Sequence, residues 1–271
     1  MNRSLYTLYH LRYNLIKGVK EFIMNETIQS QLNHRTIREF KDQRLDDQTI
    51  QTLLDVANSG ATSNGMQFFS IIRIENQEVK AALAENGKQD YMARAPHLWI
   101  FVADLFRNYT IAQEDGVEND LMIGFDKFIQ AYTDAIIATQ NVVNALESLG
   151  LGANYFGNIH NNTAHIIDLL KLPKLTYPAV GLGFGIPDQD PQIKPKMSMD
   201  IKSSVDHYEI YDNYHEVIAD YDQEMENYYD LRDSNRRSDT FSTQIPKKQG
   251  RVLEKRGEMF KTLLNQGFII K

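Results

Sequence analysis

Cysteine is absent from this chain of 271 residues. Its absence excludes disulfides, thiolate nucleophiles, cysteine-ligated zinc and iron–sulfur clusters. Any redox chemistry would therefore need a bound organic cofactor. Basic residues are also outnumbered, because 29 Lys and Arg face 36 Asp and Glu. The net charge of -7 provides no field that attracts a phosphate backbone, so we expect no nucleic-acid partner.

Long apolar runs are missing as well. The longest one, residues 98–103, is far below the ~20 residues that a membrane-spanning helix needs. We therefore expect a soluble, cytoplasmic protein with no membrane partner. Residues 1–23 lack the apolar core and the small-residue cleavage site of a secretory signal, and we expect an N-terminal extension there. An added amphipathic helix that packs on the body is the alternative.

Several common catalytic motifs are not found. The glycines at 181, 183 and 185 have the wrong spacing for a dinucleotide fingerprint, and Pro187 follows where a helix would begin. No segment has the pattern of a P-loop, a zincin or a nucleophile elbow. The histidines have no partners at ligand spacing, so we expect no metal site, and surface or structural roles for His10, His97, His165, His207 and His215.

Helical and strand-like patterns alternate up to residue 187, and we expect one mixed α and β body over residues 24–187. Apolar spacing predicts helices that include residues 28–32, 47–58, 125–149 and 162–170. Short apolar runs predict strands at residues 70–74, 98–103, 153–156 and 177–185, of which the first two are expected to lie centrally.

Beyond Pro187 the composition changes to Pro, Lys, Asp and Tyr. Two polar helices are expected near residues 220–231 and 251–266. A segment with so little apolar content must lie across another surface, so we interpret residues 188–271 as a C-terminal arm that packs on the body or on a partner subunit.

The longest predicted helix, residues 125–149, carries alanines on its inner face. Small residues permit close helix approach, which makes this face a candidate for the core of a dimer interface. A buried central helix in a monomer is the alternative. The alanines concerned are Ala131, Ala135, Ala138 and Ala145.

Cationic and hydroxyl side chains cluster just after the first predicted helix, at His34, Arg35, Thr36 and Arg38. A guanidinium offers a planar fork to phosphate oxygens, and the Thr adds a hydroxyl donor. If the segment is extended, Arg38 points to the same side as Thr36. On these residues alone a solvated basic turn is favoured over a phosphate site.

The sequence His-Arg-Thr-Ile-Arg at 34–38 resembles the N-terminal signature of the nitroreductase superfamily, in particular of its NADPH-dependent FMN nitroreductases and flavin reductases. Further segments resemble that family in the same order along the chain. They are residues 62–67, Gln89, residues 147–152 leading to 155–158, residues 170–173 with 181–183, residues 194–196 and residues 232–237.

The resemblance implies an FMN site and an NADPH site. His34, Arg35, Thr36, Lys194 and Lys196 would surround the FMN phosphate, and Arg38 would lie near the pyrimidine edge of the flavin. The ring edge and the ribityl chain would be bound by Gln89 and by the loop with Thr62, Ser63, Asn64 and Gln67. The Gly157 N–H would reach flavin N5, with Tyr155, Phe156 and Asn158 beside it. Arg232, Arg236 and Arg237 would hold the 2′-phosphate of NADPH, although a helix C-terminus offset by basic residues fits them equally well.

Two residues depart from the family pattern: Lys196 stands where we expect Arg, and Asn158 where we expect a second Gly. Both leave flavin binding intact, but the first exchanges a bidentate clamp for a point charge. The second bears on the local backbone and on the choice of acceptor.

The resemblance also implies a fold and a reaction. The fold is α+β and nitroreductase-like, with a central, mainly antiparallel sheet flanked by helices and an extended C-terminal arm, in a homodimer with two FMN sites. The reaction is ping-pong, from NADPH to a nitroaromatic, a quinone or a similar organic acceptor. A flavin reductase or azoreductase on the same scaffold, or a non-enzymatic flavin-binding protein, remains an alternative. No side chain is needed as an acid or base.

Overall fold

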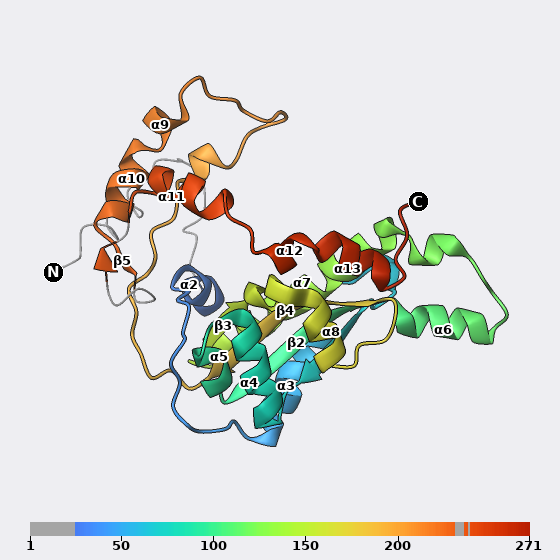
Figure 1. Cartoon of the computed structure of the whole chain (residues 1–271). Helices are drawn as coiled ribbons and strands as arrows, with labels where there is room; N and C mark the ends of the chain where they lie inside the picture. Colours follow the sequence, from blue (N-terminus) through green and yellow to red (C-terminus); the bar gives the residue numbers. More distant parts are fainter. Residues whose placement is uncertain (1–24, 231–235, 238) are drawn as a thin grey trace.

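The computed structural model describes residues 25–230, 236–237 and 239–271 (Figure 1). The expected extension at residues 1–23 lies outside the described residues. Within the described part, no helix combines the length and the apolar content that crossing a membrane requires.

A four-stranded antiparallel sheet forms the centre of the body, in the strand order β1-β2-β4-β3. Every residue of β2 and β4 is buried, which matches their continuous apolar runs. The expectation that β1 lies centrally was wrong, because β1 is an edge strand of this sheet. The β-branched residues of β1 pack against the helices that cover its faces. This packing does not depend on how many strands flank β1, so the residue types did not predict its edge position. The bounds are β1 Phe69–Arg73, β2 His97–Asp104, β3 Gly152–Phe156 and β4 Thr176–Gly185.

Helices cover both faces of the sheet. On β2, Trp99 and Phe101 point to a core shared with α3 (Asp47–Asn58) and α7 (Phe125–Ser148). Leu98, Ile100 and Val102 point to the other face. That face is covered by α4 (Gln77–Gly87), α5 (Tyr91–Arg94), the turn η3 (Gly157–Asn162) and α8 (Thr163–Leu169).

The alanine face of α7 is buried within its own chain. Ala131, Ala135 and Ala138 are at most 1% exposed and pack in the cores beneath the sheet. The prediction that these alanines form the core of a dimer interface was therefore wrong, because the sheet already occupies the space that a partner helix would need. The opposite face of α7 exposes Phe125 and Ile129.

The C-terminal arm leaves the body after β4 and returns to it. In Figure 1 the orange and red segment with α9 to α11 lies away from the sheet, whereas α12 and α13 lie along the body. The helix predicted at 220–231 ends at Glu226, and the one predicted at 251–266 consists of two short helices. The arm elements are η4 Met199–Ile201, α9 Tyr214–Val217, α10 Ala219–Glu226, β5 Tyr229–Asp230, β6 Arg236–Arg237, α11 Phe241–Gln249, α12 Glu254–Gly257 and α13 Met259–Asn265.

The end of the arm is fixed to the body by buried contacts. The Gln266 side chain donates to the carbonyl oxygens of Pro173 (2.8 Å) and Thr176 (2.9 Å). Phe268 is 2% exposed and packs against Phe128. The last part of the arm therefore packs on its own body. The remaining elements are α2 Glu26–Leu32, η1 Ser63–Gly65, α6 Phe106–Glu114 and η2 Asp120–Ile123.

Candidate functional site

The cationic segment, residues 34–38, is extended and attached to the sheet. Thr36 forms a parallel bridge with Ala153 at the start of β3, and the Ile37 N–H donates to the Ala153 carbonyl oxygen (2.9 Å). The Ile37 side chain covers Gly152, where an added Cβ would lie 2.5 Å from Ile37 Cγ1. The segment is therefore part of the folded body and not a solvated turn.

Acidic residues far away in the sequence pair with two side chains of this segment. Nδ1 of His34 pairs with the carboxylate of Glu147 at the C-terminal end of α7, and the Arg35 guanidinium donates to Asp190. Glu147 is largely buried, whereas Asp190 is exposed. Each of these contacts holds a side chain of residues 34–38 at the junction of α7, β3 and the chain that follows β4.

Buried polar atoms without partners gather at the same place. In the described part of the chain, four buried side-chain atoms have no hydrogen-bond partner: Arg35 Nε, Arg38 Nε, Asn154 Nδ2 and Asn158 Oδ1. The first three belong to residues 34–38 or to Asn154, which the bridge between Thr36 and Ala153 places side by side, and the fourth lies four residues further along the chain, in η3. A buried unpaired donor costs about 1–3 kcal/mol, more when it is charged. This arrangement fits a ligand that brings hydrogen-bond acceptors to two guanidinium groups.

Lys194 and Lys196 follow this junction along the chain. Both are exposed, and they lie four and six residues beyond Asp190, which contacts Arg35. Four residues span at most ~14 Å, so Lys194 is tethered near the cationic segment. The Pro195 carbonyl between the two lysines accepts a hydrogen bond from the Tyr221 hydroxyl (3.5 Å), which joins this stretch to α10.

The end of β3 and the turn η3 bring four more predicted residues to this edge. Phe156 is 1% exposed and is a core residue. The Tyr155 hydroxyl donates to Gln140 (2.8 Å), and burial, with the charge of Glu147, raises the pKa of this hydroxyl above its ordinary value of 10. Gly157 is exposed, and an added Cβ there would meet no atom of this chain within 4 Å. Open space therefore lies beside the backbone that was predicted to approach the flavin.

Gln89 is placed next to the same turn through the end of α4. The Asn158 side chain donates to the carbonyl oxygen of Gly87, the last residue of α4 (3.1 Å). Lys88 then takes a left-handed conformation (φ 53°), and the Gln89 N–H donates back to the Ala84 carbonyl oxygen (3.1 Å). The structure thus brings Gln89 and Gly157, which are 68 positions apart, to neighbouring segments.

The predicted loop at residues 62–67 lies elsewhere, on the first half of α7. The Ser63 N–H and hydroxyl donate to Asp134 Oδ1 (2.8 and 2.9 Å), and the Phe68 N–H donates to Asp134 Oδ2 (3.2 Å). The Asn64 side chain donates to Gln130 (3.3 Å). Asn64 and Gln67 both have positive φ, so these contacts hold the loop, which starts at Thr62, in an uncommon backbone conformation.

The loop and the cationic segment do not form one cluster within the chain. Ser63 contacts α7 at Asp134, and His34 contacts it at Glu147. Thirteen residues of helix separate these positions, about 20 Å along the axis. The structure therefore divides the predicted flavin contacts into two groups, at opposite halves of one helix.

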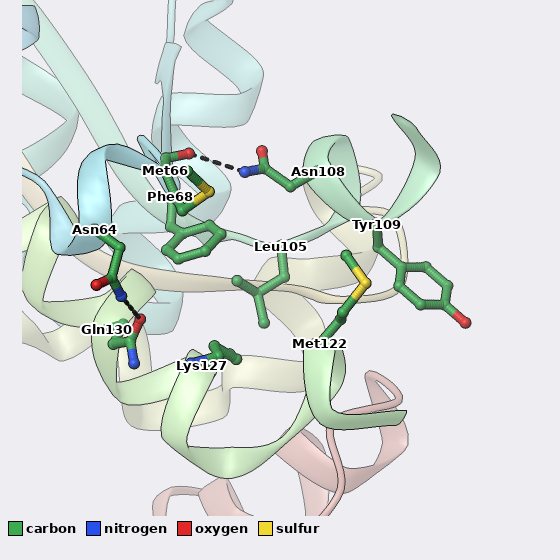
Figure 2. Close-up of a pocket in the computed structure, with 9 residues that line it drawn as sticks. All are labelled: Asn64, Met66, Phe68, Leu105, Asn108, Tyr109, Met122, Lys127 and Gln130. Atoms are coloured by element: carbon green, nitrogen blue, oxygen red, sulfur yellow. Dashed lines mark hydrogen bonds between the residues drawn. The ribbon is translucent and has the colours of Figure 1, made fainter. Parts of the chain in front are cut away.

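A cavity of about 200 Å³ lies beside the loop (Figure 2). Its floor is apolar, and amide side chains form part of its edge. The Asn108 side chain, at the start of α6, donates to the Met66 carbonyl oxygen (2.9 Å). Sequence reasoning missed this cavity, because its lining comes from separate segments that include Asn64, Met66, Phe68, Leu105, Asn108 and Gln130.

The acidic partners of these segments differ in how far they could be predicted from the sequence. Asp134 lies among buried alanines on the inner face of α7, and an acid on an apolar face indicates a bound partner. Glu147 falls within a segment that resembles the family, but it was not assigned a role. Asp190 and Gln189, whose side-chain oxygen accepts from the N–H groups of Arg38 (3.2 Å) and Glu39 (2.8 Å), left no signal.

Of the three arginines predicted to bind NADPH, Arg232 lies outside the described residues. Arg236 and Arg237 form β6, which pairs with β5 in the register Asp230 to Arg236 and Tyr229 to Arg237. The alternative of a helix C-terminus was wrong for these two, because α10 ends at Glu226. Their role in NADPH binding stays a prediction.

Comparisons with known proteins agree with this architecture. A family model described as "Nitroreductase family, C-terminal domain" matches residues 194–271. The chain is 35% identical to "FMN reductase (NADPH)" of Bacillus subtilis over 82% of this chain and 90% of that protein. It is 34% identical to "Oxygen-insensitive NADPH nitroreductase" of Salmonella typhimurium over 90% and 99%.

Solved structures give the same result. A nitroreductase of B. subtilis superposes with a TM-score of 0.83 and 31% identity, over 89% of this chain and 98% of that one. An NADPH:FMN oxidoreductase from Vibrio harveyi, solved in complex with NAD+, has a TM-score of 0.79 and 30% identity over 90% and 98%. With the α+β fold and the order of its motifs, the chain belongs to the nitroreductase family.

Proposed function

We propose that this chain is an FMN-dependent oxidoreductase that takes electrons from NADPH and passes them to a small organic acceptor. The observation that carries the proposal is the pair of buried guanidinium nitrogens, Arg35 Nε and Arg38 Nε, that have no partner in the described chain. The relatives are named for FMN and NADPH, which supports this cofactor and this electron donor. A reduced flavin and a nicotinamide also satisfy the need for an organic redox group in a chain without cysteine.

The residues at the junction of β3 and residues 34–38 suit a mononucleotide. A phosphate dianion is stabilised by paired cations and hydroxyl donors, which His34, Arg35, Thr36, Lys194 and Lys196 provide. FMN, when bound, supplies the electron-carrying chemistry between NADPH and the acceptor. Arg38 contributes a fixed positive charge that favours the uptake of negative charge by the ring. Tyr155, Gly157, Asn158 and Gln89 would flank that ring, beside the space that is open at Gly157.

The active form that we propose is a homodimer. The loop at residues 62–67 lies about 20 Å along α7 from the cationic segment, so a second copy would have to bring its own loop to this one. The exposed face of α7 offers an apolar contact surface, because Phe125, Ile129 and Ile136 follow one another at helical spacing and are 37–47% exposed.

The simplest test is optical. The purified protein, after reconstitution with FMN if necessary, should be yellow and should bleach when NADPH is added without oxygen. Light scattering should give about twice the chain mass of 31.3 kDa. A colourless protein that does not take up FMN would reject the flavoenzyme, and a monomer with full activity would reject the homodimer.

The relatives differ in the electron acceptor, since one is named for FMN reduction and another for nitro-group reduction. We propose nitroaromatics and quinones as acceptors in ping-pong kinetics, with free flavin as the second candidate. Steady-state rates with NADPH against a panel of nitroaromatics, quinones, azo compounds and free FMN separate these activities. Intersecting rather than parallel double-reciprocal lines would contradict the ping-pong scheme.

A further inference from the structure

The turn η3 is tied to the end of α4 by asparagine side chains. Asn158 Nδ2 donates to the Gly87 carbonyl oxygen (3.1 Å), and Asn161 Nδ2 lies 3.3 Å from the same oxygen. In the other direction, Asn86 Nδ2 donates to the Ile159 carbonyl oxygen (3.2 Å). These side chains therefore connect two backbone segments that no strand pairing joins.

Asn158 and Gly87 are matched in shape. A Cβ built on Gly87 would lie 2.1 Å from Asn158 Nδ2, 2.8 Å from its Cγ and 3.4 Å from its Oδ1. The three nearest atoms all belong to the Asn158 side chain. Glycine at position 87 is thus what allows the asparagine amide to lie flat against the end of α4. The other amide atom, Oδ1, is buried without a partner in the described chain.

The contact between Asn158 and Gly87 lies beside two residues that we expect to contact the flavin. Gly87 is two residues before Gln89, and the left-handed Lys88 fixes the path between them. Asn158 directly follows Gly157, whose far side is open. The Asn158 amide therefore links the backbone next to Gly157 to the backbone two residues before Gln89. The residue that stands at the family's second glycine is consequently the one that joins these two segments.

We propose that Asn158 is a positioning residue that sets the placement of Gly157 against Gln89, and through it the environment of the flavin ring. This inference rests on the proposed function. It assigns a role to Asn158, the main departure from the family pattern in this chain. It also predicts that the midpoint potential of bound FMN depends on Asn158, which acts through Gly157 and Gln89.

The test uses FMN-loaded full-length protein with Asn158→Ala, Gly87→Ala and the double variant. Asn158→Ala keeps a Cβ but removes the amide, and we expect a shifted visible spectrum, a changed midpoint potential and an approximately tenfold lower kcat/KM for NADPH, which is the size of one hydrogen bond. Gly87→Ala should produce similar changes, because its methyl group displaces the amide. The double variant should match Asn158→Ala alone, since the methyl group then has room.

Two further variants separate positioning from folding. Asn158→Asp has nearly the same shape but places a carboxylate oxygen against the Gly87 carbonyl. It should therefore shift the visible spectrum and the midpoint potential without a change in side-chain volume. This variant carries the test if Asn158→Ala fails to fold. Gln51→Ala, on the exposed face of α3, is the control that should leave both unchanged. The thermal midpoint of each variant without FMN reports its fold.

The outcomes distinguish the two proposals. A wild-type chain that binds no FMN overturns the proposed function and this inference with it. A wild-type chain that binds FMN, together with Asn158 variants whose spectrum, midpoint potential and kinetics equal those of the wild type, overturns this inference alone. Strict additivity of Gly87→Ala and Asn158→Ala would also overturn it, because the two residues would then act independently.

Discussion

The two halves of α7 hold polar groups in opposite ways. At its C-terminal end, Glu147 pairs with His34, and the neighbouring Arg35 Nε and Arg38 Nε are buried without a partner in the described chain. In its first half, Asp134 accepts two hydrogen bonds from Ser63, in the loop at residues 62–67, and one from Phe68, just after it. One half retains buried donors without a partner in the described chain, whereas the other is a loop whose shape is already set. From this difference we propose that affinity for the cofactor arises at the C-terminal end of α7. The exact placement of the cofactor would then depend on the loop at residues 62–67.

The largest effect should follow from Arg35→Ala. Removing the guanidinium takes away a charge-assisted phosphate contact, and we expect FMN affinity to fall about 100-fold. Quenching of FMN fluorescence on titration measures the dissociation constant. Arg35→Lys should recover part of the loss, because it restores the charge but not the planar fork.

Arg44→Ala is the matched control. Arg44 is an exposed arginine paired with Glu75 (2.5 Å) and lies outside the proposed site. Equal losses in Arg35→Ala and Arg44→Ala would show that general charge, and not the position of Arg35, determines FMN affinity. The comparison between the two halves of α7 would then lose its basis.

Asp134→Asn tests the other half of the helix. The Asn amide has one oxygen and one NH2 group, whereas both Asp134 oxygens accept hydrogen bonds. The NH2 group would face a group that also donates, so at least one buried donor loses its acceptor. We expect the free energy of unfolding to fall by about 1–3 kcal/mol. Urea denaturation of the protein without FMN measures this directly.

The exposed Asp126→Asn on the same helix should leave the unfolding midpoint nearly unchanged, because its partners Lys127 and Gln130 are also exposed or half-buried. If Asp134→Asn unfolds at the wild-type urea concentration, the three hydrogen bonds do not fix the loop. Lower FMN affinity with unchanged stability would mean instead that Asp134 acts directly on the cofactor.

The β5–β6 hairpin gives a smaller expected effect. Arg236→Ala together with Arg237→Ala should raise the Michaelis constant for NADPH about tenfold while changing that for NADH much less, because only NADPH carries the phosphate that guanidinium groups recognise. Initial rates with each nicotinamide measure the ratio. Lys202→Ala, an exposed cation elsewhere in the arm, is the control. Equal changes for the two donors would reject a role in selecting NADPH.

Features that depend on residues close together in the sequence could be predicted, whereas features that depend on distant residues could not. Asp46 caps α3 through the Thr49 N–H, and Gly150 follows the end of α7, so short-range chemistry placed these helices closely. The cations at 34–38 were identifiable from their residue types. Their partners were not, because Asp190 is 155 positions from Arg35 and carries no local pattern.

The failures have the same physical origin. Residues 229–230, which were predicted to be helical, pair instead with residues 236–237, and the edge position of β1 depends on strand order. The match of Asn158 with Gly87 depends on two segments 71 positions apart. Each of these is a tertiary contact, and a single sequence shows the residues that make such a contact without showing which ones meet.

The smallest expected effect concerns the sheet that supports both halves. His97 Nε2 accepts a hydrogen bond from the Leu45 N–H (2.9 Å), and the ring stacks on Phe184, so the imidazole is neutral. Burial, followed by the positive charge of Arg44, lowers the pKa of His97 from 6.5 to about 4. The unfolded chain therefore binds a proton at a higher pH than the folded chain does. Stability is fully present above pH 6.5 and falls as the pH decreases toward 4.

Between pH 7 and pH 5.5 this histidine should reduce the free energy of unfolding by about 1 kcal/mol. Urea denaturation at the two pH values measures the loss, and His97→Asn should diminish it. Part of the loss should remain in His97→Asn, because burial also lowers the pKa of His160 and its protonation likewise destabilises the folded chain. The exposed His207→Asn should keep the full pH dependence. If His97→Asn retains it as well, protonation of His97 does not limit the acid stability of the sheet, and the acid sensitivity must arise from other groups.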